Sequence, residues 1–425
     1  MKNHHLIKST FVLCFLPTIL AAKPLAFTSA EDVGMSQKAL NKIDTSMQSY
    51  IDENRLGDIE VLIARKGKIV YNKSFSNNTS KNKNASLYRI ASMTKPITSV
   101  AIMILAEEGK LSLEDPISGY IPEFKNVKVL VDDSSEKKET YQLVDAKREI
   151  MVKDLLTHTS GIIYKFLKVK HLSKIYHENG VSDGLDNSIG LIGDNVKKIA
   201  KLPLKHQPGE HFTYGLSTDV LGYLVEVVSQ KTLSQYFREK ILEPLKMNDT
   251  HFYLSEKKFS RLVPLYTPDE KNGIRQIDEE KDKNNLITRF KYTGKESYFS
   301  GGGGLVSSAN NYARFLQMMI NKGELDGVRI LKSKTVELMF ENHIKQIEQG
   351  DGNFHFGLGF MISNKPTAKE VIPEGSLSWG GIFHTEFWID PSNDLIGVSM
   401  AQKFPAPKSD IHVKFKTLVY EALID

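Results

Sequence analysis

Ser92 and Lys95 are the residues whose types and spacing most directly suggest chemistry. In a helix, side chains three positions apart lie on one face, so the Ser92 hydroxyl and the Lys95 amine are predicted neighbours. A serine hydroxyl is a poor nucleophile by itself, and a partly desolvated lysine can accept its proton. Helix N-terminal N–H groups also stabilise a developing oxyanion. The pair is therefore a candidate nucleophile and base, although Ser-x-x-Lys alone also occurs by chance in exposed helices.

The element that must position this pair is a helix over residues 92–109. Ser92 is expected at its N-cap, Gly109 suits its exit, and Pro96 falls in the first turn, where proline is least damaging. Apolar residues recur at helical spacing along one buried stripe, namely Ile97, Val100, Ala101, Ile104 and Leu105.

The segments before and after this helix are predicted to share one sheet. Residues 36–51 have helical spacing, and residues 59–71 read as a hairpin turning at Lys66 and Gly67. Residues 111–294 are expected to be mostly helices and loops. Later elements are expected at 310–322 (helix), 356–360, 387–389 and 396–400 (strands) and 411–423 (helix). The late strands should join the early hairpin.

The N-terminus has the layout of a secretory signal peptide. Lys2 and Lys8 precede an apolar stretch over 11–22 that ends in small residues, and it is too short to span a bilayer. Cleavage after Ala22 leaves a catalytic domain over 23–425 with no stable membrane span, located in the periplasm or secreted. The only cysteine, Cys14, is removed with the leader, so no disulfide or thiolate nucleophile is expected.

Composition excludes several classes of function. The chain has 425 residues, 40% hydrophobic and 25% charged, and a net charge of +5 without basic runs, so nucleic-acid binding is not expected. The histidines show no H-E-x-x-H or paired spacing, so no metal is predicted. Residues 301–304 lack a G-x-G-x-x-G continuation and indicate a turn of closely approaching backbones rather than a nucleotide loop, so no cofactor is predicted. The oligomeric state stays open.

Several stretches together resemble the serine β-lactamases and penicillin-recognising hydrolases, in the order of that superfamily. Residues 88–98, which contain Ser92 and Lys95, resemble its active-site stretch, and Tyr214-Gly215-Leu216 resembles the tyrosine motif of the class C branch and its esterase relatives. Further matches are residues 154–161, 208–214, 219–222, 302–308 and 379–391. The resemblance runs from about residue 30 to the C-terminus.

The resemblance implies roles for individual residues. Ser92 matches the acylated serine, Lys95 the lysine that deprotonates or orients it, and Tyr214 the tyrosine that relays the proton. The backbone N–H groups of Ser92 and Ile382 are expected to form the oxyanion hole. Without its flanking matches, Tyr214 would be interpreted as a core tyrosine.

The chain departs from β-lactamases at two positions of the implied substrate site. Leu216 stands where those enzymes have an asparagine, and Trp379 where they have the lysine that helps hold the substrate carboxylate. Trp379, Gly380 and Gly381 replace the Lys-Thr-Gly motif, and Trp-Gly-Gly is a feature of the esterase members. Trp379 can also serve as a packing residue. Leu216, Trp379, Gly380 and Gly381 are accordingly the predicted substrate-binding residues.

The resemblance implies an α/β (α+β) fold of the serine β-lactamase type. An antiparallel sheet flanked by helices, from about 30–110 and 300–425, would enclose an inserted, mostly helical part over about 111–299. The predicted function is that of a serine hydrolase using an acyl-enzyme, a carboxylesterase on small or apolar esters. The alternatives are a β-lactamase or D-Ala-D-Ala carboxypeptidase, and a non-catalytic peptidoglycan-binding or sensor homologue.

A Ser-His-Asp triad is the rival mechanism. No G-x-S-x-G elbow supports it, and Ser399 is only a partial match inside a predicted strand. His384 lies near Trp379 in the sequence and is a weak candidate to face the site.

Overall fold

The computed structural model describes most of the chain from Leu25 onward. The described residues are 25–77, 86–132, 140–185, 190–278, 282, 292, 296–347, 355–367, 371–405 and 409–424. The candidate leader over 1–22 lies outside them. Within these ranges, no helix is both long and apolar enough to cross a membrane.

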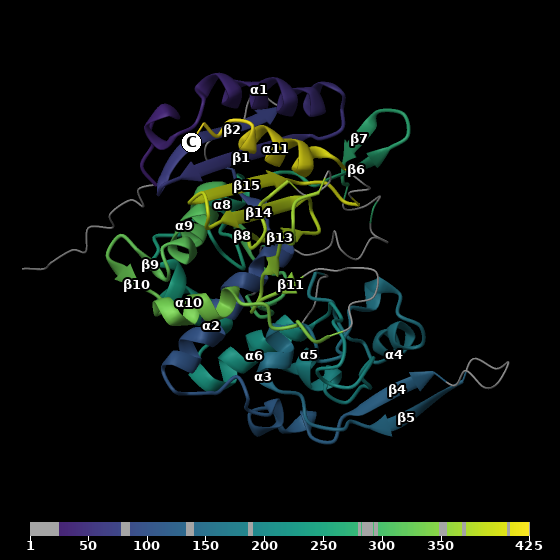
Figure 1. The fold of residues 1–425 in the computed structure, drawn as a ribbon. Helices are drawn as coiled ribbons and strands as arrows, with labels where there is room; N and C mark the ends of the chain where they lie inside the picture. Colours follow the sequence, from purple (N-terminus) through teal and green to yellow (C-terminus); the bar gives the residue numbers. More distant parts are fainter. Residues whose placement is uncertain are drawn as a thin grey trace, which may run out of the picture.

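In the described part of the chain, a seven-stranded antiparallel sheet forms the centre of the fold (Figure 1). Its order is β11-β12-β13-β14-β15-β1-β2. The strands are β1 (Asp58–Arg65), β2 (Lys68–Ser76), β11 (His355–Phe356), β12 (Met361–Ile362), β13 (Leu377–Gly381), β14 (Thr385–Asp390) and β15 (Leu395–Ala401). Because β1 pairs with both β2 and β15, the early hairpin and the late strands share one sheet, as the sequence predicted.

Helices cover both faces of this sheet. Successive side chains of a strand point to opposite faces, and on β1 Val61 belongs to one core whereas Leu62 belongs to the other. The side chain of Ser36 caps the first helix by accepting a hydrogen bond from the Ala39 N–H at 3.2 Å. The covering helices are α1 (Gln37–Asp52) and α11 (Ile411–Tyr420) on one face, and α2 (Thr94–Glu107) and α9 (Ala309–Ile320) on the other.

A mostly helical part is inserted between the early and late strands (Figure 1). Its helices are α3 (Val152–Leu156), α4 (Leu172–Glu178), α5 (Ile192–Ile199), α6 (Ser217–Ser229), α7 (Leu233–Phe237) and α8 (Glu256–Phe259). Helix α2 packs against α6 and also belongs to the sheet core, so it joins the two parts.

Short elements complete the chain. The paired strands are β3 (Tyr88–Arg89) with β8 (Val306–Ser307) and β9 (Glu324–Leu325) with β10 (Val328–Arg329). The helix α10 (Ser333–Phe340) and short turns are also present, namely η1 (Glu31–Val33), η3 (Ala91–Met93), η4 (Ile117–Gly119), η5 (Pro122–Phe124), η6 (Lys165–Leu167) and η7 (Arg238–Leu242).

The structure differs from the sequence prediction in two places. The segment expected to hold mostly helices and loops also contains two ribbons, β4 (Lys128–Asp132) with β5 (Tyr141–Asp145), and β6 (Tyr266–Asp269) with β7 (Gly273–Gln276). All side chains of β5 are exposed, so no apolar alternation marked this strand. The strand expected over 356–360 is interrupted at Gly359, whose φ of 93° breaks an extended segment.

Candidate active site

Ser92 lies in the short 3-10 turn η3, directly before α2. The sequence predicted it as the N-cap, but α2 begins at Thr94 and Met93 occupies that position. Ala91 has a φ of 43°, in the left-handed region that residues with side chains rarely adopt. The chain therefore enters α2 through a tight turn rather than from the extended conformation typical of an N-cap residue.

Ser92, Lys95 and Tyr214 meet in the structure, although Tyr214 is distant in the sequence. The Lys95 Nζ donates a hydrogen bond to the Ser92 Oγ at 3.2 Å, and the Tyr214 hydroxyl donates to the same oxygen at 2.7 Å. The Lys95 Nζ also lies 4.7 Å from the centre of the Tyr214 ring. The serine hydroxyl thus has two groups within proton-transfer distance, which suits a nucleophile and its base.

Two further hydrogen bonds orient Lys95, which is buried. Its Nζ donates to the Gly302 carbonyl oxygen at 2.7 Å and to the Tyr164 hydroxyl at 3.1 Å. Burial raises the pKa of Tyr164 well above its usual range, so this hydroxyl stays protonated. Sequence reasoning did not identify Tyr164, because only the fold brings it to Lys95.

Asp219 lies next to Gly302 and Tyr164, and it is fully buried on α6. Its Oδ1 accepts a hydrogen bond from the Ser300 Oγ at 2.6 Å. A Cβ added at Gly302 would lie 2.3 Å from the Asp219 Oδ2 and 2.9 Å from the Tyr164 hydroxyl, so the three groups pack closely. Burial raises the pKa of Asp219, whereas the Ser300 hydrogen bond and the charge of Lys95 act against this rise. The sequence match over 219–222 contained Asp219 but indicated no role for it.

Tyr214 is positioned by a close approach between its own backbone segment and the segment that contains Ile162. A Cβ at Gly215 would lie only 2.0 Å from the Ile162 carbonyl oxygen, so glycine is required after the tyrosine. The ring of His158 lies 5.0 Å from the Tyr214 ring. Burial, and secondly the charge of Lys95, hold the pKa of His158 well below its usual range, so it packs as a neutral ring.

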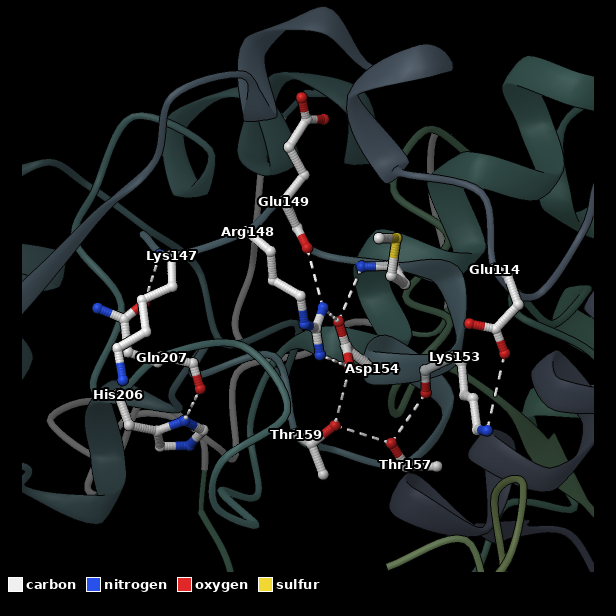
Figure 2. Close-up of polar contacts among 11 residues, drawn as sticks. Glu114, Lys147, Arg148, Glu149, Lys153, Asp154, Thr157, Thr159, His206 and Gln207 are labelled. Atoms are coloured by element: carbon white, nitrogen blue, oxygen red, sulfur yellow. Dashed lines mark hydrogen bonds and ion pairs between the residues drawn. The ribbon is translucent and has the colours of Figure 1, made fainter. Parts of the chain in front are cut away.

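Asp154 anchors the segment that carries His158. Figure 2 shows its carboxylate accepting hydrogen bonds from the Arg148 Nη1 at 2.5 Å and Nη2 at 2.9 Å. The Met151 N–H donates to Asp154 at 2.8 Å and the Thr159 hydroxyl at 3.3 Å. The matched stretch over 154–161 therefore has a structural role at the start of α3. It contacts Tyr214 through His158.

Ser92 opens into a cavity of about 450 Å³. Its wall contains Tyr164 and Tyr214, and the Trp379 ring lies 5.4 Å from the Tyr214 ring. The other lining residues are Phe166, Leu185, Gly302, Met361, Ser378, Gly380, Gly381, Ile382 and Glu386. Within the described ranges, no group of three or more His, Cys, Asp or Glu side chains is arranged to hold a metal ion.

The other predicted site residues divide into two groups. Trp379, Gly380, Gly381 and Ile382 line the cavity at the end of β13, and the oxyanion role of the Ile382 N–H stays a prediction. Leu216 is fully buried at the N-cap of α6 and is not one of the lining residues identified above. Its predicted contact with substrate also stays a prediction.

His384 does not line the described cavity wall. It follows β13 with a φ of 73°, and its ring lies 4.6 Å from that of His412. Burial, reinforced by His412 and Lys403, lowers the pKa of His384 to about 3. It is a neutral packing residue at physiological pH.

Comparisons identify proteins similar to this chain. The family model described as Beta-lactamase matches residues 43–419. An uncharacterised protein of Mycobacterium tuberculosis is 35% identical over 332 residues, 75% of this chain and 78% of that protein. Esterase EstB of Burkholderia gladioli is 26% identical over 365 residues, 82% of this chain and 86% of EstB. Among solved structures, EstCE1, a hydrolase with promiscuous acyltransferase activity, has a TM-score of 0.73 at 24% identity, covering 90% of this chain and 99% of that chain.

Proposed function

The chain belongs to the Beta-lactamase family, and from this premise we propose that it is a serine hydrolase acting as a carboxylesterase on small or apolar esters. The observation that carries the ester assignment is the cavity wall beside Ser92. Trp379, Met361 and Phe166 supply apolar surface, and the lining residues in the described part of the chain include no lysine or arginine. Such a wall favours an uncharged substrate.

The proposed reaction has two halves, each a transfer of the same acyl group. The Ser92 Oγ attacks the ester carbonyl carbon while its proton moves to the Lys95 and Tyr214 pair. The N–H groups of Ser92 and Ile382 bind the oxyanion of the tetrahedral intermediate. The intermediate collapses, the alcohol leaves with the proton, and the acyl-enzyme remains. Water then attacks the acyl-enzyme and gives a proton to the same pair, which returns it to the Ser92 Oγ as the bond from this oxygen to the acyl carbon breaks and the acid leaves.

The same wall disfavours β-lactams. The resemblance implies that related lactamases hold the substrate carboxylate with a lysine, and Trp379 occupies that position here. A hydrogen bond to a charged group contributes about 1.5–3 kcal/mol, so its loss corresponds to roughly one to two orders of magnitude in kcat/KM. The only charged side chain among the described lining residues is Glu386, whose carboxylate accepts hydrogen bonds and has none to donate to a second carboxylate.

The test compares kcat/KM for nitrophenyl butyrate and a chromogenic cephalosporin on one preparation. We expect the ester to be strongly preferred, and we expect Trp379→Lys to narrow the difference. Leu216 is left unchanged because an asparagine there would place an amide in the core. Preference of the native protein for the cephalosporin would replace the esterase proposal with the β-lactamase alternative.

The nucleophile is tested separately by intact mass spectrometry. Exposure to a fluorophosphonate should add one adduct to the native protein and none to Ser92→Ala, which should also lose ester hydrolysis while keeping its thermal transition. An unlabelled native protein would favour the non-catalytic alternative, a peptidoglycan-binding or sensor homologue.

Export belongs to the same proposal. The lysine-flanked apolar stretch over 11–22 suggests cleavage after Ala22, which leaves 23–425 as the catalytic domain in the periplasm or the medium. N-terminal sequencing of protein from the native host tests this, and a cytosolic chain that still begins at Met1 contradicts it.

A further inference from the structure

The catalytic cavity reaches Gly380 near the end of β13, beyond the residues that pair with β12. The described pairs between β12 and β13 end at Ser378, so the last residues of β13 extend beyond the neighbouring strand. A Cβ at Gly380 would meet only one atom within 4 Å, the Thr385 carbonyl oxygen at 3.1 Å. The space over Gly380 is therefore open.

Glu386 lies directly across from this opening. It pairs with Gly380 between β13 and β14, and residues opposite one another in an antiparallel pair project to the same face. Its side chain is 19% exposed and lines the cavity. Because Gly380 has no side chain, no side chain at that position separates Glu386 from the cavity.

Two side chains from α11 hold this carboxylate. The Lys416 Nζ lies 2.8 Å from the Glu386 Oε1, and the His412 Nδ1 lies 3.2 Å from the Oε2. Burial alone raises the pKa of Glu386, but its interactions with His412 and Lys416 outweigh burial and lower that pKa. Burial lowers the pKa of His412, so this ring is neutral at physiological pH. Glu386 and Lys416 thus form an ion pair with no net charge.

The pair retains capacity for another hydrogen bond. Each carboxylate oxygen has two acceptor positions, and the 2.8 Å contact of Lys416 is to the Oε1. A second polar group lies two residues before Gly380 on the same face, the hydroxyl of Ser378. It is buried and has no hydrogen-bond partner among the described residues, and Ser378 also lines the cavity. A buried hydroxyl without a partner indicates an unfilled polar contact.

We propose that Glu386, Ser378 and the opening at Gly380 form a polar subsite that binds a neutral hydrogen-bond donor of the substrate, namely a hydroxyl on the acyl or the alcohol part of the ester. An ammonium group is a poorer fit, because Lys416 already neutralises the carboxylate and would repel it. The indole of Trp379 on the neighbouring wall has only a donor and offers a hydroxyl no acceptor. The subsite rests on the proposed esterase function and narrows its substrates to hydroxylated esters.

The experiment uses matched substrate pairs that differ by hydroxyl groups. Nitrophenyl 3-hydroxybutyrate against nitrophenyl butyrate tests the acyl side, and glyceryl monobutyrate against propyl butyrate tests the alcohol side. We expect the native enzyme to prefer the hydroxylated member of one pair by about tenfold or more in kcat/KM, as one hydrogen bond to a charged acceptor implies.

The double variant removes the acceptor without leaving a buried charge, whereas Glu386→Gln keeps a neutral acceptor beside Lys416. Glu386→Leu combined with Lys416→Met removes both ion-pair partners, because removing one alone leaves the other uncompensated. This variant should lose the hydroxyl preference, and Glu386→Gln, which keeps a neutral acceptor, should retain a reduced one. The control is Lys42→Met with Glu421→Leu, an exposed pair 3.5 Å apart that also links the α1 and α11 region, and it should keep the native preference.

Three outcomes overturn the subsite. They are equal kcat/KM values within both substrate pairs, an unchanged preference in the double variant, or, where circular dichroism shows that variant to be unfolded, an unchanged preference in Glu386→Gln. Failure of the proposed function is distinct, since it would show neither butyrate hydrolysis nor fluorophosphonate labelling of the native enzyme.

Discussion

Lys95 makes three hydrogen bonds at once, to the Ser92 hydroxyl, the Tyr164 hydroxyl and the Gly302 carbonyl oxygen. The side-chain nitrogen has three hydrogen-bonding positions, one of which is an acceptor when the amine takes the Ser92 proton, so these three partners occupy all of them. The side chain is therefore held in one direction relative to Ser92. Fixed geometry of this kind is what a fast proton transfer requires.

Tyr164 should accordingly act as a positioning residue. Tyr164→Phe removes the 3.1 Å hydrogen bond to Lys95 while keeping the ring, and we expect kcat for nitrophenyl butyrate to fall by about ten- to a hundredfold with little change in KM. Combined with Tyr214→Phe, the loss should be smaller than the product of the two single losses, because both residues serve one proton path.

The matched control is Tyr236→Phe. Tyr236 is also buried, and its hydroxyl has no hydrogen-bond partner in the part of the chain that the structure describes. The Tyr236→Phe variant should hydrolyse nitrophenyl butyrate at the native rate. Equal effects of Tyr164→Phe and Tyr236→Phe, or independent losses in the double variant, would count against a positioning role.

The sequence predicted the candidate reacting groups but not the residues that support them. Ser92 and Lys95 share one helix face, and Tyr214 lies in a matched motif, so local pattern and resemblance predicted all three. Tyr164 and Asp219 reach Lys95 only through packing between distant segments, which no spacing along the chain encodes. Their contacts belong to tertiary structure.

At the scale of elements, the glycine turn over 301–304 packs against both α2, which carries Lys95, and α6. The Thr98 hydroxyl on α2 donates a hydrogen bond to the Gly301 carbonyl oxygen at 2.7 Å. A Cβ at Gly222 on α6 would lie 3.2 Å from the Gly301 Cα. The close backbone approach expected from the sequence is therefore present, and it brings the Gly302 carbonyl to Lys95.

A side chain inside this turn should disturb the site. In Gly302→Ala the new Cβ would lie 2.3 Å from the Asp219 Oδ2, so the turn or α6 must shift, and overpacking of this kind typically costs about 1–3 kcal/mol. We expect kcat to fall by more than about tenfold and the thermal midpoint to decrease. Gly119→Ala is the control, since nothing lies within 4 Å of its added Cβ. Native behaviour of both variants would contradict this account.

Elements were predictable from the sequence where one face packs against a core. The apolar spacing of α1 and α11 and the hairpin of β1 and β2 reflect such burial. β5 lacks such burial, because all of its side chains are exposed, so its sequence carries no periodic signal. In its partner strand β4, only Val129 and Leu130 are buried.

At the scale of the whole molecule, the two ends of the described chain depend on each other. β15 pairs with β1 in the centre of the sheet, the Ser36 N–H donates to the Ala422 carbonyl oxygen at 2.8 Å, and the Ile424 N–H donates to that of Gly34 at 3.1 Å. Residues from the start and the end of the sequence must therefore assemble together, which favours slow folding through contacts of long sequence separation.

The stability of this shared sheet should fall as the pH rises, because of Glu60. Glu60 is buried on β1, and burial raises its pKa from the ordinary 4.5 to about 8, against a hydrogen bond from Tyr88. The folded state therefore binds a proton that the unfolded state releases above pH 4.5. The neutral Glu60 thereby contributes to the free energy of unfolding. This contribution is fully present below the unfolded pKa and is lost as the pH rises through about 8, and the whole loss in the free energy of unfolding is roughly 5 kcal/mol.

Glu60→Gln keeps a neutral side chain of similar shape, so its thermal midpoint should decrease less than that of the native protein between pH 6 and pH 9. The measurement is thermal unfolding by circular dichroism of both proteins over this range, with the difference between them cancelling groups that titrate in both. Parallel curves would mean that Glu60 does not change its protonation on folding, and that the buried carboxylate on β1 is stabilised as an ion.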